Sequence, residues 1–157
     1  MSTPRAPSFE HGDAQSSLAA LLKPPFQRGR GRPGGWRIAT GVEVELETHE
    51  VYRPDLVGWL RTRVPERPRG RPIRVRPDWV AEILSLTNAE TDLGKKLFAY
   101  QRATIPHYWI IDPEHETLTV YRWTSEGYVV HVTAGKHESV LAPPFDLELQ
   151  VAQLFGD

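Results

Sequence analysis

One glutamate stands inside an apolar run where a purely structural core would favour no charge. Val80 and Ala81 precede Glu82, and Ile83 and Leu84 follow it; such a run is typical of a strand covered on both faces. A carboxylate among buried neighbours is costly unless a cation, a metal ion or hydrogen-bond donors accompany it. Glu82 is therefore a candidate for chemistry, and it requires a partner.

A lysine on the next element is one candidate partner. The segment from about Asn88 to Ala103 has helical character. One face of this helix carries Leu93, Leu97, Tyr100 and Thr104. Lys96 falls on the edge of this face and leans toward the sheet that holds Glu82, whereas Lys95 points nearly opposite, into solvent. The alternative is that the stem of Lys96 only covers apolar surface.

Asp55 is the second carboxylate of interest, because it follows Pro54 and opens the apolar stretch 56–60. Consecutive strands are usually neighbours, so Asp55 could meet Glu82. Asp78 is less suited, since it lies on the same strand as Glu82 and roughly 13 Å away at about 3.3 Å per residue. Two carboxylates with backbone and water oxygens favour Mg²⁺ or Mn²⁺, and a nearby lysine would polarise an attacking water or stabilise charge on a reacting phosphate. Aspartate after proline is also common in turns, so a turn role for Asp55 stays open.

The rest of the chain is expected to frame these residues. A short helix over 16–22 precedes a loop rich in glycine, arginine and proline, and a strand follows over 36–46, in which Glu43 lies on the polar face. A strand over 55–60 comes next. After the central strand and helix come a strand over 107–112, a hairpin of strands 118–123 and 128–132, and a short terminal helix within 147–154. This order predicts an α/β or α+β fold with a mixed sheet.

The composition suits one globular domain. With 157 residues, 39% hydrophobic and 25% charged, the chain is expected to form a flexible tail over 1–10 and a single domain over 11–157. The absence of cysteine excludes disulfides and thiolate zinc sites, and it favours a cytoplasmic location. No apolar run reaches membrane-spanning length, so no membrane association is expected.

Charge is divided unevenly along the chain. Residues 1–76 hold 14 Lys and Arg against 8 Asp and Glu, whereas residues 77–157 hold 5 against 12. Guanidinium groups fork onto phosphate oxygens, so this clustering favours a nucleic-acid partner. A solubilising loop is the alternative. The candidate nucleic-acid-binding residues are Arg61, Arg63, Arg67, Arg69 and Arg71.

The chain also resembles a known family. The resemblance rests on Pro54-Asp55, on the run from Pro77 to Ser85 with Glu82, on Asp92, Lys96 and Tyr100, on the run from Pro106 to Pro113, and on Glu10-His11-Gly12, Gly35-Trp36 and Glu43. These residues are similar to those of the Uma-type putative restriction endonucleases of bacteria, within the PD-(D/E)xK nuclease superfamily. The resemblance covers nearly the whole chain from about residue 8.

This resemblance implies a restriction-endonuclease-like fold, a central mixed β-sheet flanked by helices. It implies that Asp55 and Glu82 hold Mg²⁺ or Mn²⁺ and that both, with Lys96, are catalytic. Leu84 stands where the superfamily usually has its lysine, and the resemblance implies that Lys96 on the following helix takes this role instead. Glu43 becomes an additional ligand or an orienting group.

Two functions therefore stand side by side. The first is an endonuclease that hydrolyses phosphodiester bonds of nucleic acid, with DNA as the expected partner and a homodimer as one expected assembly. The second is a catalytically inactive module of the same fold that binds nucleic acid or a protein partner. Kinship of fold alone does not decide between them.

Overall fold

The computed structural model of the chain describes residues 8–29, 34–47, 49–85 and 89–156, with the backbone alone for 89–92. Residues 1–7 of the tail expected over 1–10, residues 30–33 of the loop rich in glycine and arginine, and Asn88, where the central helix was expected to begin, lie outside these residues. The elements are α1 (Phe9–Leu22), a π-helical turn η1 (Lys23–Gln27), β1 (Trp36–Thr40), β2 (Val44–Glu47), β3 (Glu50–Tyr52), β4 (Leu56–Leu60), β5 (Trp79–Ile83), α2 (Ala89–Arg102), β6 (His107–Asp112), β7 (Thr117–Thr124), β8 (Gly127–Gly135), β9 (Ser139–Leu141), β10 (Glu148–Gln150) and a 3₁₀ turn η2 (Val151–Leu154).

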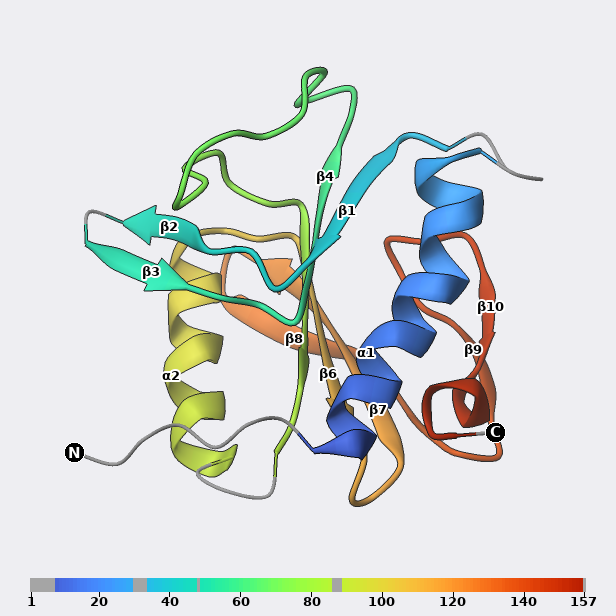
Figure 1. Cartoon of the computed structure of the whole chain (residues 1–157). Helices are drawn as coiled ribbons and strands as arrows, with labels where there is room; N and C mark the ends of the chain where they lie inside the picture. Colours follow the sequence, from blue (N-terminus) through green and yellow to red (C-terminus); the bar gives the residue numbers. More distant parts are fainter. Residues whose placement is uncertain (1–7, 30–33, 48, 86–88, 157) are drawn as a thin grey trace.

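A six-stranded mixed sheet runs through the molecule in the order β1-β4-β5-β6-β7-β8 (Figure 1). Its parallel pair is β5 and β6, which α2 connects, and the other neighbours are antiparallel. The predicted α/β class with a mixed sheet is confirmed, as are the central strand-helix-strand unit and the hairpin of β7 and β8.

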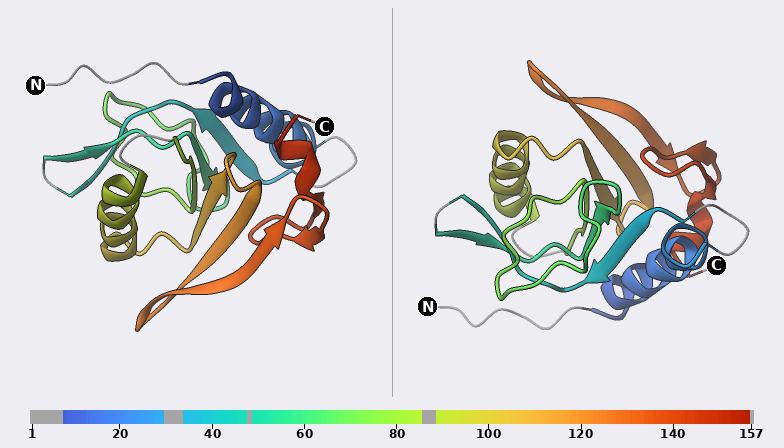
Figure 2. Two further views of the ribbon diagram at one scale, coloured as in Figure 1. Left: turned by 90° about the horizontal axis from the view of Figure 1, so that it is seen from below. Right: turned by 90° about the horizontal axis from the view of Figure 1, so that it is seen from above.

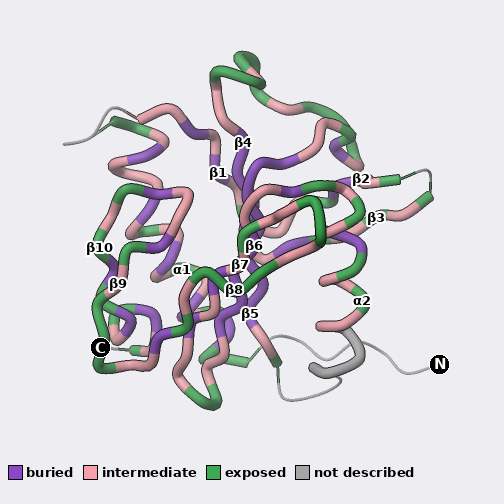
Figure 3. The backbone as a smooth tube through the Cα atoms, turned by 180° about the vertical axis from the view of Figure 1, so that it is seen from behind, coloured by how far each residue is buried: buried purple, intermediate pink, exposed green. Residues whose placement is uncertain are grey.

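The two helices cover opposite faces of the sheet (Figures 1 and 2). Trp79, Ala81 and Ile83 of β5 belong to the core that packs under α1, whereas Val80 belongs to the core under α2. Since side chains alternate along a strand, Glu82 shares the face of Val80 and points toward α2. Many of the buried residues lie in these central strands (Figure 3).

The first helix is longer than the sequence predicted. It begins at Phe9 rather than at residue 16, so Phe9 and Glu10 of the expected tail form its first turn. The Ser8 hydroxyl caps it by accepting a hydrogen bond from the backbone N–H of His11 at 3.1 Å. The extra turns put His11 against the sheet, where it is buried.

The strand predicted over 36–46 is interrupted. Gly41, at φ +63°, adopts a left-handed conformation that favours glycine. β1 before it pairs with β4 in the main sheet, whereas β2 after it pairs with β3 in a separate hairpin. The expected terminal helix is likewise replaced by β10 and the short turn η2. No helix in the described ranges is long and apolar enough to cross a lipid bilayer.

Candidate active site

Asp55 and Glu82 meet where β4 begins and β5 ends. The two strands are antiparallel with Leu56 opposite Ala81, and Asp55 and Glu82 continue this register by one residue. The backbone N–H of Ile83 donates to Asp55 Oδ2 at 2.7 Å. The predicted neighbouring of these two strands is thus confirmed, and it brings both carboxylates to one edge of the sheet.

Two side chains of α2 contact the Glu82 carboxylate. Lys96 Nζ lies 3.4 Å from Oε1, and the Tyr100 hydroxyl donates to Oε2 at 2.5 Å. Lys96 and Tyr100 are four residues apart, so they project from the same face of the helix. Glu82 is 2% exposed, and the partners that its burial requires are both on the element that the sequence indicated.

Burial dominates the ionisation of this carboxyl. Loss of water raises the pKa of Glu82 to about 7; the Lys96 amine opposes this rise and the negative charge of Asp55 adds to it. Burial, followed by the charge of Glu82, raises the pKa of Tyr100 well above its usual value. Tyr100 therefore remains a hydrogen-bond donor at neutral pH.

His11 binds the other carboxylate. Its Nε2 lies 3.0 Å from Asp55 Oδ1, and this hydrogen bond raises the pKa of His11, against the opposing effect of burial. The amide of Gln15, one turn further along α1, donates to the backbone carbonyl of Asp55 at 2.9 Å. Sequence reasoning named His11 as part of the family resemblance but gave it no chemical role. The helical spacing of four residues that are buried in the structure, His11, Ala14, Leu18 and Leu22, could have extended the predicted helix to include it.

The side chains of Asp55, Glu82, Lys96 and His11 line an open pocket of about 140 Å³, which is ample for a hydrated ion. Its wall includes His11, Arg53, Asp55, Glu82, Leu84, Lys96 and Tyr108. Leu84, at the position where the resemblance would put a lysine, contributes only an apolar wall. The hydroxyl of Tyr108 is buried and has no hydrogen-bond partner among the described residues.

The other predicted residues lie outside this pocket. Glu43 is exposed and is not part of its wall. Arg61 donates to the backbone carbonyls of Trp36 at 2.9 Å and of Gln27 at 2.7 Å, so its guanidinium binds the protein itself. Nucleic-acid binding by Arg61 stays a prediction.

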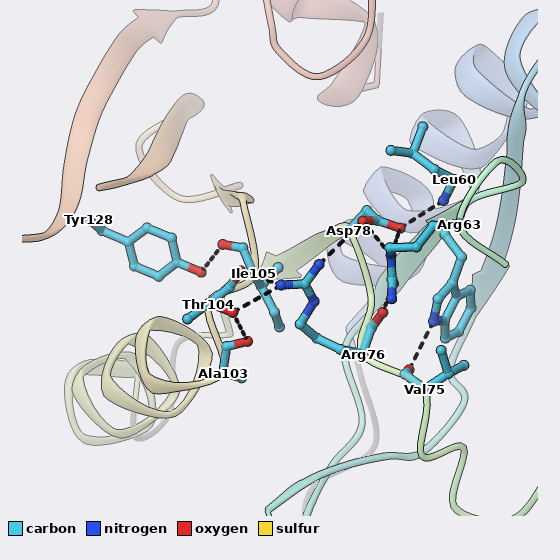
Figure 4. Close-up of polar contacts among 10 residues, drawn as sticks. Leu60, Arg63, Val75, Arg76, Asp78, Ala103, Thr104, Ile105 and Tyr128 are labelled. Carbon is cyan, nitrogen blue, oxygen red and sulfur yellow. Dashed lines mark hydrogen bonds and ion pairs between the residues drawn. The ribbon is translucent and has the colours of Figure 1, made fainter. Parts of the chain in front are cut away.

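Arg63 also serves the fold (Figure 4). Its Nε lies 2.9 Å from Asp78 Oδ1, and Asp78 in turn accepts a hydrogen bond from the backbone N–H of Leu60 at 2.8 Å. Asp78 is thus a buried structural carboxylate, which agrees with its exclusion from the ion site. Three other arginines, Arg67, Arg69 and Arg71, are exposed. None of them forms an ion pair with another described residue.

A different group has metal-ligating side chains close together. Asp112, Glu114 and His115 bring their ligand atoms within 4.8 Å of one another. Asp112 Oδ1 accepts from the backbone N–H groups of the other two residues, and its Oδ2 lies 2.8 Å from His115 Nδ1. These hydrogen bonds stabilise the turn between β6 and β7, and this structural role explains why the three side chains lie close together.

Comparison with known proteins agrees with this fold. A crystal structure described as a putative nuclease of the DUF820 family from Anabaena variabilis superimposes with a TM-score of 0.77, at 22% identity over 99% of this chain and 84% of that one. No curated protein matched the chain. Residues 2–152 match the family model Uma2, described as "Putative restriction endonuclease". The chain therefore belongs to the Uma2 family.

Proposed function

We propose that this protein is a divalent-metal-dependent endonuclease that hydrolyses phosphodiester bonds, with DNA as its substrate. One observation carries the proposal: a buried Glu82 and Asp55 from neighbouring strands share an open pocket with the Lys96 amine 3.4 Å from Glu82. The Uma2 family, described as putative restriction endonucleases, supports the same reaction class.

The donor chemistry fits a hard cation. Asp55 and Glu82 offer carboxylate oxygens, the ligands that Mg²⁺ and Mn²⁺ prefer. Burial, with the negative charge of Asp55, raises the pKa of Glu82, and a divalent cation near both groups would favour the ionised form of each. When bound, such an ion makes water a better nucleophile and neutralises charge on the phosphate.

The surrounding side chains then have separate tasks. Tyr100 holds one oxygen of Glu82 and His11 holds one oxygen of Asp55, so both carboxylates are oriented before a ligand arrives. The amine of Lys96 lies beside Glu82, where it can polarise the attacking water or stabilise charge on the phosphate.

The exposed arginines provide the contact with the DNA backbone. Arg67, Arg69 and Arg71 lie on the loop between β4 and β5, and their charges are available to phosphates. Arg61 and Arg63 hold this loop through bonds to the protein itself. A homodimer, a cytoplasmic location and a ligand role for Glu43 stay predictions.

Cleavage of supercoiled plasmid DNA with Mg²⁺ or Mn²⁺ tests the proposal. Nicking should be abolished in each of three variants, Asp55→Ala, Glu82→Ala and Lys96→Ala. Their circular dichroism spectra should match that of the folded wild-type protein. Lys95→Ala is the matched control, because the neighbouring lysine is exposed, and it should keep full activity.

Calorimetric titration with Mn²⁺ separates the two functions considered above. Wild type should bind the ion and Glu82→Ala should not. Salt-dependent DNA binding without any heat of metal binding would instead support an inactive nucleic-acid-binding module, and equal activity of wild type and Glu82→Ala would refute the catalytic assignment.

A further inference from the structure

Of the three basic side chains that line the pocket, two lie beside a carboxylate and the third does not. His11 lies 3.0 Å from Asp55 and Lys96 lies 3.4 Å from Glu82. Arg53, which also lines the pocket, pairs with no carboxylate of the described residues. Within the described part of the chain, Arg53 is therefore a positive charge at the pocket that no carboxylate neutralises.

Arg53 is exposed, yet it is held in place. Its Nε donates to the carbonyl of Gly41 at 2.9 Å, and its two terminal nitrogens have no hydrogen-bond or ion-pair partner among the residues that the structure describes. The N–H of the same glycine donates to the backbone carbonyl of Asp55 at 3.4 Å. The turn at Gly41 thus fastens both ends of the segment from Arg53 to Asp55.

The conformation of Gly41 suits this arrangement. At φ +63° any residue with a side chain would be strained, whereas the space beside it is adequate, because a Cβ there would lie at an ordinary contact distance of 3.6 Å from Arg53 Nη2. The turn at Gly41 therefore orients Arg53 through the hydrogen bond to its carbonyl. An arginine oriented by its Nε presents a planar pair of donors, the geometry that binds phosphate oxygens in a forked manner.

We infer that Arg53 binds the phosphodiester group that enters the pocket, beside the carboxylates of Asp55 and Glu82. The inference rests on the proposed function and specifies which residue recognises the anion at the reacting position. It separates this residue from the arginines of the exposed loop, which meet flanking phosphates.

Binding of a short fluorescein-labelled DNA duplex in EDTA, followed by fluorescence anisotropy over a salt series, tests this inference without catalysis. Arg53→Ala should weaken binding about tenfold, as loss of a charged hydrogen bond does, and lower the salt slope by about 0.9, the value for one phosphate contact. Arg53→Lys should keep most of the slope but lose affinity, because a lysine cannot fork.

Arg122→Ala is the matched control. Arg122 is exposed on β7 opposite His107, at the end of the sheet away from the pocket, because His107 pairs with Trp79 at the start of β5. This variant should bind DNA as wild type does. If Arg53→Ala matches Arg122→Ala in affinity and salt slope, or if wild type binds no DNA, the inference is wrong.

Hydrolysis of bis(4-nitrophenyl) phosphate with Mn²⁺ separates the inference from the proposed function. This substrate has a single phosphodiester, so Arg53→Ala should lower kcat/KM about tenfold or more, whereas Arg67→Ala should not change it. An effect of Arg53→Ala on binding with no hydrolysis by wild type would keep the phosphate contact and refute the nuclease. Hydrolysis by wild type that Arg53→Ala leaves unchanged would refute the phosphate contact alone.

Discussion

Replacing Glu82 with glutamine removes a carboxyl whose burial opposes folding at neutral pH. The side chain is 2% exposed and its pKa is raised from 4.5 to about 7. Between these values the folded protein binds a proton that the unfolded chain has released, so stability falls as the pH rises through this window. Each pH unit is worth about 1.4 kcal/mol, which gives a total loss of about 3 kcal/mol above pH 7.

Glutamine keeps the shape of the side chain and can still accept a hydrogen bond from Tyr100, but it does not titrate. The difference in unfolding free energy between Glu82→Gln and wild type should therefore grow by about 3 kcal/mol between about pH 4.5 and about pH 8. Urea unfolding of the metal-free proteins in EDTA, at a series of pH values, measures this difference. Glu148→Gln is the control, because Glu148 is exposed, and its curve should follow wild type.

Curves for Glu82→Gln and wild type that run parallel over this pH range would refute the reasoning, because an ionised Glu82 would then cost nothing to bury. Mn²⁺ provides the second arm. A bound divalent ion favours the carboxylate, so wild type should regain stability at high pH on addition of the ion. Glu82→Gln should gain little.

Three further perturbations test the framework around the site. Asp78→Ala removes a buried carboxylate that binds the partly exposed guanidinium of Arg63 and the backbone N–H of Leu60, so urea unfolding should show a loss of about 1–3 kcal/mol, and a loss below about 1 kcal/mol would contradict a structural role for this carboxylate. Gly58→Ala puts a Cβ 3.1 Å from the rings of Trp36 and Trp79; it should lower the Tm by an amount equivalent to about 1–3 kcal/mol, and an unchanged Tm would show that the rings can move apart. Burial, with the repulsion of neighbouring positive charges, lowers the pKa of His107 below 6.5, so the unfolded state gains the proton first and stability falls as the pH drops below 6.5. His107→Gln should flatten the acid side of the Tm profile, and an unaltered profile would refute this cause.

Local pattern was sufficient for the centre of the molecule. The apolar run around Glu82, the helical spacing that turns Lys96 inward and the apolar run over 107–112 each depend on near neighbours in the chain, and each formed as predicted. The meeting of Asp55 with Glu82 followed from a general rule, that consecutive strands tend to pair.

The chain before Asp55 was less predictable, because its structure depends on distant contacts. Nothing local indicates that β2 leaves the main sheet after Gly41 to pair with β3. The early start of α1 is similar: a histidine reads as polar in sequence, yet His11 is buried because the Asp55 carboxylate, 44 positions along the chain, supplies its hydrogen bond.

The arginines show the same division. Their clustering is a property of the sequence, and it predicted a basic face. Only the tertiary structure distinguishes these arginines from one another. Arg61 and Arg63 form hydrogen bonds within the protein, whereas Arg53 lines the pocket. Composition and periodicity determined which charges this protein has and on which elements they lie, whereas long-range packing decided which of them are paired, since pairing depends on groups that the chain brings together only when it folds.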